Sequence, residues 1–167
     1  LKYESHPPCS KEYYELALSK FDNNRQVVIF SDDTGTIFNI NENGKIRWKK
    51  NIYGKRYKKI YKNLTFSIYK NNIYVADNIG FIYAISLDTG KLIWIKNHGV
   101  PFKSKIKVGT VVDFPFGDSD TSSKLKEAKV AIDNGAFDID FVCDYNAFKR
   151  KSFEKFDLDI LEGTKKC

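Results

Sequence analysis

The sequence predicts a chain of mixed class: antiparallel β-sheet over residues 25–106, then a βαβα segment over 107–167. Three observations lead to this prediction. Strand patterns and turn residues recur at a fixed spacing in the first part. Strand-like and helix-like periodicities alternate after Pro101. The charge balance also changes sign along the chain, which favours two pieces of different origin over one continuous domain.

Residues 1–24 carry the pattern of a helical lead-in. Ser10 is a helix-capping residue, and Tyr14, Ala17, Leu18 and Phe21 follow at spacings that place them on one helix face. We therefore expect an amphipathic helix from Ser10 to Phe21, without a chemical motif.

The part from Arg25 onwards repeats one unit of strands and turns. Turns rich in Asp, Asn and Gly separate short apolar runs, a pattern that favours hairpins. The expected strands are 27–30, 36–40 and 45–48, and then 73–76, 81–85 and 91–94. Gly35 and Gly80 are 45 residues apart, and Trp48 and Trp94 are 46 apart. A period of this size, with one tryptophan in each unit, is typical of β-propeller blades.

Stacking explains why each unit carries a tryptophan. A blade is a small twisted sheet that buries little surface until another blade covers it. A large flat ring at the end of a strand fills the space between neighbours, so Trp48 and Trp94 are expected to pack rather than to catalyse. About two blades fit into 25–106, and a closed ring needs more. We therefore expect open strand edges or loops that bind protein partners, and self-association.

The pattern changes to βαβα in the last third of the chain. Residues 105–114 form a nearly continuous apolar run, which is typical of a strand buried on both sides. Residues 137–145 form the next expected strand. The helix between them is expected to be capped within Thr121–Ser123 and to end at Gly135. A final helix is expected to begin at Ser152. The residues expected to face inward from the two helices are Leu125, Ala128, Ile132, Phe153, Phe156 and Ile160.

The run GFIYAISLDTGKLIW at 80–94 resembles the repeat of the quinoprotein-type β-propellers, with Ala84, Thr89, Gly90 and Lys91 among the matching positions. Within that group, 25–107 look most similar to the BamB family, which serves as a scaffold in outer-membrane protein assembly. The resemblance implies a periplasmic interaction module without a cofactor. It does not imply a quinone or calcium site.

The motifs TVVDFPFG, EAKVAIDNGAFDIDFV and DILEGTKKC within residues 107–167 resemble the deoxyribose-phosphate aldolases. That family folds as a (β/α)8 barrel, so the resemblance implies a βαβα fragment of such a barrel. The family uses a Schiff-base lysine, and the resemblance places its catalytic aspartate at Asp140. No lysine here matches the Schiff-base position, because Lys165 and Lys166 belong to the helix ending. Asp113 also stands where the family commonly has glycine.

Asp140 is interpreted from strand alternation as well. On a strand over 137–145, Asp138, Asp140 and Asp144 point to one side and the apolar residues to the other. A face with three carboxylates cannot stay dry without partners. In a closed barrel such a face lines an active site. In an isolated segment it is solvated, and we favour this solvated, inert interpretation because the essential amine is missing.

Charge suggests one further binding surface. Residues 1–108 carry 19 basic and 9 acidic side chains, whereas residues 109–167 carry 9 and 12. Nine of the basic residues lie within 45–62, interleaved with tyrosines. Such a stretch can bind nucleic acid or an anionic membrane surface. The alternative, which we favour, is a solvated segment between blades.

Other kinds of site have little support. The three cysteines show no metal-ligand spacing, and His6 and His98 are isolated, so no metal or cofactor site is expected. Neither ring can close, so the primary expectation is an interaction scaffold fragment joined near Val108 to a catalytically incomplete aldolase segment. Whether the join is natural or artificial stays open. The alternative is a deoxyribose-phosphate aldolase fragment or derivative. The location would be the periplasm for the first interpretation and the cytoplasm for the second.

Overall fold

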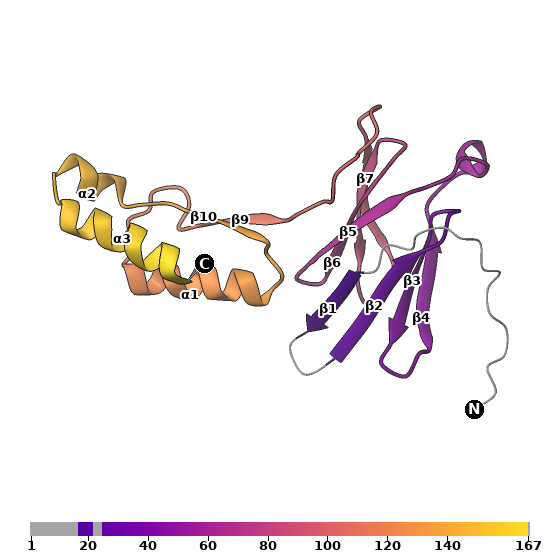
Figure 1. Cartoon of the computed structure of the whole chain (residues 1–167), viewed down its shortest axis with the longest axis horizontal. Helices are drawn as coiled ribbons and strands as arrows, with labels where there is room; N and C mark the ends of the chain where they lie inside the picture. The colour runs from indigo at the N-terminus through magenta and orange to yellow at the C-terminus, as the bar shows by residue number, and fades with distance from the viewer. Residues whose placement is uncertain (1–16, 22–24, 167) are drawn as a thin grey trace. The chain divides into compact units, whose positions relative to one another are not determined.

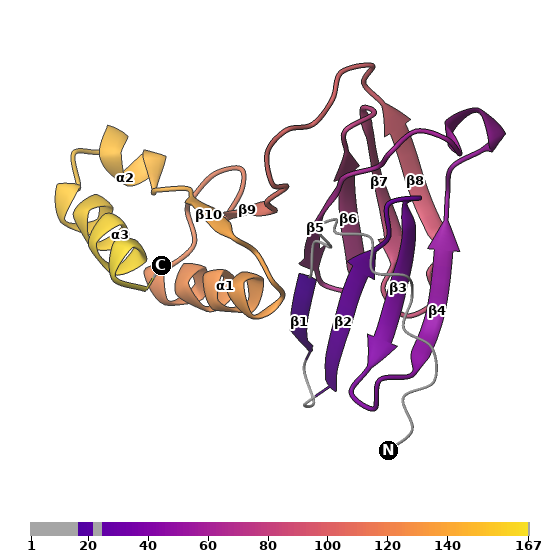
Figure 2. The same cartoon turned by 45° about the vertical axis from the view of Figure 1, so that its right-hand side comes forward.

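The computed structural model describes residues 17–21 and 25–166 and divides the chain into two compact units. The first unit ends at Ile106 and the second begins at Lys107, with Ile68–Lys70 grouped with the second. The first unit holds two antiparallel four-stranded sheets, which lie side by side in both Figure 1 and Figure 2. Over the described ranges, every helix falls short of the length and apolar character that crossing a bilayer requires.

The first sheet has the strand order β1-β2-β3-β4, so each strand pairs with its neighbour in the sequence. Tight turns make this order possible: Gly44 adopts a φ of +73° between the last two strands, a conformation that glycine reaches without a steric penalty. The strands are β1 Ala17–Phe21, β2 Arg25–Ser31, β3 Thr36–Asn41 and β4 Ile46–Asn51.

The second sheet repeats this arrangement in the order β5-β6-β7-β8. A short 3-10 helix, η1 Lys55–Tyr57, lies between the two sheets in the sequence. The strands are β5 Leu64–Tyr69, β6 Asn72–Asp77, β7 Phe81–Ser86 and β8 Leu92–Asn97. The expected antiparallel sheets are thus confirmed.

The 45-residue period is visible as a repeated turn. Asp32 Oδ1 accepts hydrogen bonds from the backbone N–H groups two and four residues later, at 3.0 and 2.8 Å. Asp77 Oδ1 does the same at 2.9 and 2.8 Å. The glycines of these turns, Gly35 and Gly80, have φ angles of +80° and +103°. The same side-chain chemistry therefore closes the same hairpin twice.

The core of the first unit lies between two buried sheet faces. Asn39 marks the face of the first sheet that meets the second, because its Nδ2 donates to the Leu87 carbonyl at 2.9 Å. The residues buried on the same face as Asn39 are Val27, Ile29 and Ile37. The buried face of the second sheet carries Ile73, Val75, Tyr83 and Ile85.

The expected helix from Ser10 to Phe21 is wrong over its last residues, where Ala17–Phe21 form strand β1. The remainder of that helix lies outside the described residues. Ala17 pairs with Ile29 and Phe21 with Arg25, so this strand completes the first sheet. The backbone hydrogen bonds offered by the edge of β2 outweigh a helix periodicity that rests on four residues.

The second unit alternates strand and helix. Two short parallel strands, β9 Gly109–Val112 and β10 Asp138–Phe141, form a sheet that helix α1 Thr121–Asp133 connects. Asp120 caps α1 by accepting from the Ser123 N–H, so the cap lies one residue before the expected range. The helix ends at Gly135, as expected, with a φ of +97°.

The end of the chain departs from the prediction. A short helix, α2 Tyr145–Lys149, precedes α3 Phe153–Lys166 and was not expected. The face of α3 that is buried carries Asp159, whereas Phe153 and Ile160 are exposed, contrary to the expected inward face. Ile132 of α1 is exposed as well. A polar network, described below, takes the buried positions that the apolar periodicity assigned to these residues.

Candidate functional site

Asp140, the predicted catalytic residue, lies in the middle of β10 opposite Val111 of β9. Its side chain is exposed, and its two strand neighbours Ile139 and Phe141 are half-buried on the other side. Within the described chain, no hydrogen bond or ion pair joins Asp140 to a lysine. Asp138 is exposed on the same side. Strand alternation therefore placed Asp140 correctly on a solvated face, but the structure brings no amine to it.

Asp144 departs from this pattern, because it is buried rather than solvated. The strand ends at Phe141, and Asp144 becomes the N-cap of α2, accepting from the Ala147 N–H at 2.7 Å. Its other carboxylate oxygen accepts from Lys155 Nζ at 2.6 Å. The hydrogen bond from Lys155, with that of Ala147, holds the pKa of Asp144 below its usual value. Asp144 in turn raises the pKa of Lys155.

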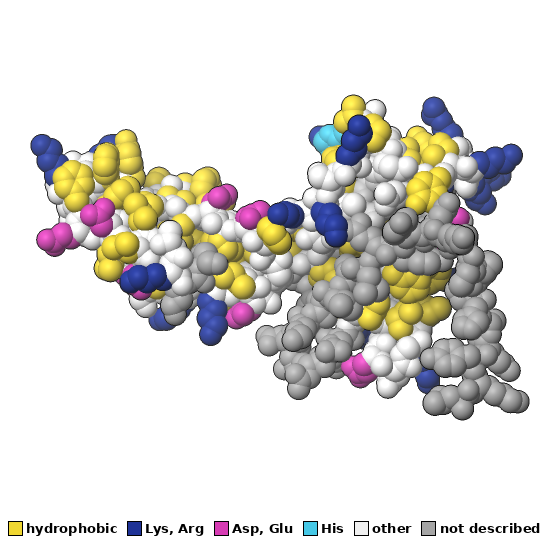
Figure 3. Space-filling model, in the orientation of Figure 1, with side chains coloured by type: hydrophobic (Ala, Val, Ile, Leu, Met, Phe, Trp, Pro, Cys, Tyr) yellow, Lys and Arg dark blue, Asp and Glu magenta, His cyan; other side chains and the backbone are white. Residues whose placement is uncertain are grey.

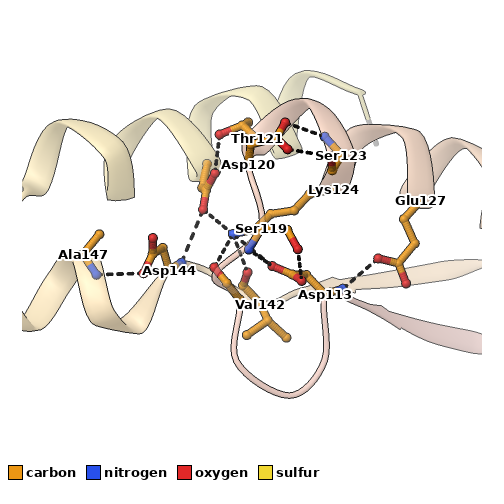
Figure 4. A network of polar contacts seen from close by, with 12 residues as sticks. Asp113, Ser119, Asp120, Thr121, Ser123, Lys124, Glu127, Val142, Asp144 and Ala147 are labelled. Carbon is orange, nitrogen blue, oxygen red and sulfur yellow. Dashed lines mark hydrogen bonds and ion pairs between the residues drawn. The ribbon is translucent and has the colours of Figure 1, made fainter.

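A buried lysine forms the centre of the second unit (Figure 4). Lys124, on the first turn of α1, has a fully buried side chain. Its ammonium donates to the carbonyl oxygens of Gly117 and Val142, at 2.7 and 3.1 Å, and to Asp159 Oδ2 of α3. Because an ammonium has three N–H donors, these contacts use all of them.

The buried carboxylate opposite this lysine is also fully engaged. Asp159 Oδ1 accepts from the Thr121 hydroxyl at 2.5 Å. Asp159 Oδ2 accepts from Lys124 and, at 3.3 Å, from the backbone N–H of Asp144. Lys124 and Asp159 thus join α1, α3, the end of β10 and the loop before α1, and we call these contacts the Lys124 network. Partnering on this scale is what a charged pair needs to remain ionised inside a protein.

Asp113 extends the Lys124 network at the end of β9. Its Oδ2 lies 3.6 Å from Lys124 Nζ, and its carboxylate accepts from the N–H and the hydroxyl of Ser119 at 2.9 and 2.7 Å. Its backbone has a φ of +58°, the left-handed region that favours glycine. This is the position at which the resemblance expected glycine, so the chain accepts an unfavourable backbone angle and gains a carboxylate beside Lys124.

The Lys124 network can take part in few reactions, because all three N–H donors of Lys124 are already used. A lysine that forms a Schiff base must present an unprotonated, accessible amine to a carbonyl. Lys124 is buried, paired with Asp159 and without a free donor direction. Cys143 is only partly covered, and burial, with Asp159 nearby, raises the pKa of its thiol, which disfavours the reactive thiolate. The network therefore acts as a structural clamp.

The first unit offers a different kind of site, at the edge of its second sheet. Within the described sheets, β8 pairs with β7 alone. All residues of β8 after Leu92 are exposed, including the apolar Ile93, Trp94 and Ile95 at 52%, 42% and 43%. An edge strand with apolar side chains exposed on both faces is an unusual surface for a protein in water, which makes it a candidate binding edge.

The equivalent tryptophan of the first sheet is already packed. Trp48 of β4 donates its indole N–H to the Leu87 carbonyl at 2.7 Å. A Cβ atom added to Gly90 would lie 2.7 Å from the Trp48 ring, so the ring packs directly on this turn of the second sheet. Trp48 therefore has the packing role expected of it, whereas Trp94 contacts Tyr74 of its own sheet, with ring centroids 6.3 Å apart.

The basic stretch 45–62 does not form one surface. Its lysines and arginines on β4 and around η1 are exposed, and in Figure 3 dark-blue side chains gather where Figure 1 places η1. Tyr53 is buried instead, and its hydroxyl donates to Asp77 at 2.5 Å. Lys62 is buried too, and burial lowers its pKa. Base stacking on this stretch would need exposed rings between the charges, and of its three tyrosines only Tyr57 and Tyr61 are not buried.

Sequence reasoning missed the Lys124 network and the exposed edge β8. Part of the signal for the network was present, because Lys124 lies four residues before Ala128, a residue expected to face inward; the burial of Asp144 and Asp159 had no such signal. For the edge, Ile93, Trp94 and Ile95 form three consecutive apolar residues, which period-two alternation does not allow on a half-buried strand. Across residues 17–21 and 25–166, no group of three His, Cys, Asp or Glu side chains is arranged to hold a metal ion.

Comparison with known proteins gives two separate resemblances, and no family model matches the chain. Deoxyribose-phosphate aldolase of Mycoplasmopsis pulmonis is 40% identical over 74 residues, which cover 44% of this chain and 33% of that protein. The Clostridioides difficile enzyme of the same name is 38% identical over 69 residues, or 41% and 32% of the two chains. That of Thermococcus kodakarensis is 33% identical over 90 residues, or 54% and 40%. The chain spans about a third of the length of these relatives.

Among solved structures, BamB from Moraxella catarrhalis is similar with a TM-score of 0.40 and 17% identity. The similarity covers 57% of this chain and 27% of that one. Both resemblances expected from the sequence are thus confirmed, each over part of the chain.

Proposed function

We propose that this chain is a protein-binding module that acts through the exposed edge strand β8, and that its second unit is a catalytically incomplete segment of an aldolase-type barrel. The observation that carries the binding role is the exposure of Ile93, Trp94 and Ile95 on a strand that pairs on one side only within the described sheets. An edge strand offers unpaired backbone groups to an added strand, and the apolar side chains supply the area that stabilises the complex.

A photocrosslinking experiment tests this role. A benzophenone amino acid replaces Lys96, which is exposed on β8 on the same side as Trp94. The control carries it at Lys50, which pairs with Ile37 as Lys96 pairs with Ile82 and is therefore its counterpart in the first sheet. We expect a discrete crosslinked protein complex from position 96 only. No complex from position 96, or equal complexes from both, would contradict the role of β8.

Aldol cleavage is the second candidate, because the identity to deoxyribose-phosphate aldolases reaches 40% over 74 residues. Borohydride reduction in the presence of deoxyribose 5-phosphate traps any Schiff base as a mass increase on a lysine. We expect no adduct, because Lys124 is saturated and Asp140 has no described amine partner. An adduct that disappears in an Asp140→Asn variant would establish the aldolase interpretation instead.

A further inference from the structure

The contact between the two sheets is directional, because a tryptophan of the first sheet packs on a turn of the second. Among the described residues, the tryptophan of the second sheet and the turn of the first sheet lack the equivalent contact. Trp48 of the first sheet lies on the turn that joins β7 to β8 in the second sheet. The register shows that Trp94 is the counterpart of Trp48: Trp48 pairs with Asn39, Trp94 pairs with Ala84, and a bulge follows at the same place in both sheets. Trp94 therefore points away from the first sheet, toward the position of a third.

The β7–β8 turn receives Trp48, and its counterpart in the first sheet, the β3–β4 turn, receives no tryptophan from the described residues. The β3–β4 turn closes with a hydrogen bond from Gly44 N–H to the Asn41 carbonyl, and the β7–β8 turn with one from Gly90 N–H to the Ser86 carbonyl. Both glycines have a positive φ, +73° and +67°. Among the described residues, none lies within 4 Å of a Cβ atom added to Gly44, whereas Trp48 occupies this space at Gly90.

We infer that a second copy of this chain fills both vacancies, by placing its Gly44 turn under Trp94 of the first copy. This inference rests on the proposed binding role of β8 and names its partner. The contact repeats an interface that the chain already contains, with Trp94 Nε1 as donor and the Glu42 carbonyl, which accepts no hydrogen bond from the described residues, as acceptor.

Charges of the same sign occupy equivalent places near both contacts. Within the chain, β4 carries Lys50 and the β7–β8 turn carries Asp88; in the contact between copies, β8 carries Lys96, the counterpart of Lys50, and the β3–β4 turn carries Glu42. One difference remains, because the counterpart of Asn39 is Ala84, which cannot donate the second hydrogen bond. The contact between copies is therefore weaker than the one within a copy.

A contact that joins the tail of one copy to the head of the next is heterologous, so it leaves one free Trp94 and one free Gly44 turn on every open assembly. It grows with concentration until a ring closes or a filament forms. A symmetric pairing of two β8 edges would instead stop at a dimer and would not involve Gly44.

Sedimentation velocity over a range of concentrations tests the inference with two blocked variants. Trp94→Ala removes the ring, and we expect the association to weaken on the order of 30-fold or more, as for other buried interface tryptophans. Gly44→Asn fills the receiving space, and asparagine tolerates a positive φ. Val130→Ala and Gly99→Asn are the controls: Val130 is an exposed apolar residue of α1 in the second unit, and Gly99 has a φ of +72° with no described residue within 4 Å of an added Cβ atom. Both controls should associate like the unchanged chain.

Mixing the two blocked variants gives the sharpest outcome. Each alone should be monomeric, and an equimolar mixture should form a dimer and nothing larger, since one free Trp94 meets one free Gly44 turn. A mixture that stays monomeric, or variants that still associate alone, would overturn the inference, as would an unchanged chain that is monomeric throughout. In that last case a crosslink from position 96 to a different protein would leave the binding role of β8 intact, whereas no crosslink would remove both.

Discussion

The indole N–H of Trp48 donates to the Leu87 carbonyl, which also accepts from Asn39, so one backbone oxygen of the second sheet holds two side chains of the first. We expect Trp48→Phe to lower the free energy of unfolding by about 2 kcal/mol, from one lost hydrogen bond and a smaller packed ring. The Leu87 carbonyl keeps its bond from Asn39 and is not left unsatisfied. Trp94→Phe is the control. In urea titrations of dilute protein, it should lower the free energy of unfolding by less than about 0.5 kcal/mol.

The two turn aspartates should differ in importance, because only Asp77 is buried and bonded to the Tyr53 hydroxyl. Asp77→Ala leaves that hydroxyl and three backbone N–H groups without their acceptor, and we expect a loss of about 3–4 kcal/mol. Asp32→Ala, at a partly exposed turn, should cost about 1–2 kcal/mol. Equal losses in urea titrations would contradict the distinction between a buried and an exposed turn.

Breaking the Lys124–Asp159 pair should destabilise the second unit strongly. Lys124→Met leaves a buried carboxylate without its cation, and Asp159→Leu leaves a buried ammonium, each at a cost of about 3–5 kcal/mol. Because the double variant removes both charges, it should be more stable than either single variant. A double variant whose loss equals the sum of the single losses would show that the two residues do not act as a pair.

The stability of the second unit should depend on pH through Asp144. Its folded pKa lies below the unfolded value, so the stabilisation is present above the ordinary aspartate pKa of about 4 and is lost as pH falls through the depressed folded pKa. Lys155 is 40% exposed, so the effect should be at most about 1 kcal/mol. Asp144→Asn keeps the helix cap and removes the charge, and its unfolding free energy between pH 6 and pH 2 should show a smaller fall. Asp133→Asn, at an exposed residue, should follow the unchanged chain.

The repeat in the first unit was predictable because turn chemistry is local. Asp, Asn and Gly at fixed spacing give the hairpins without reference to distant residues, so the turns at Gly35 and Gly80 and the pairs within β2–β4 and β6–β8 were predicted, whereas β5 was not. Strand β1 was not predictable in this way, because its identity depends on the backbone edge of β2 rather than on its own periodicity.

In the second unit, by contrast, local periodicity did not predict which side chains are buried. Apolar periodicity put Phe153, Phe156 and Ile160 inside, yet α3 buries Asp159. A charged side chain can be buried only when its partners converge from elsewhere, here Thr121 and Lys124, and such convergence cannot be read from one helix. Asp140 was placed correctly on an exposed face because strand alternation is a local rule.

Trp48 and Trp94 are equivalent residues of which only Trp48 is covered, and the chain has just these two tryptophans. Acrylamide quenching of indole fluorescence, measured on the Trp48→Phe and Trp94→Phe variants at concentrations where the chain is monomeric, tests this directly. We predict strong quenching and a red-shifted emission when Trp94 alone remains, and weaker quenching when Trp48 alone remains. Equal quenching, or a Trp94 that is better shielded than Trp48, would contradict the account.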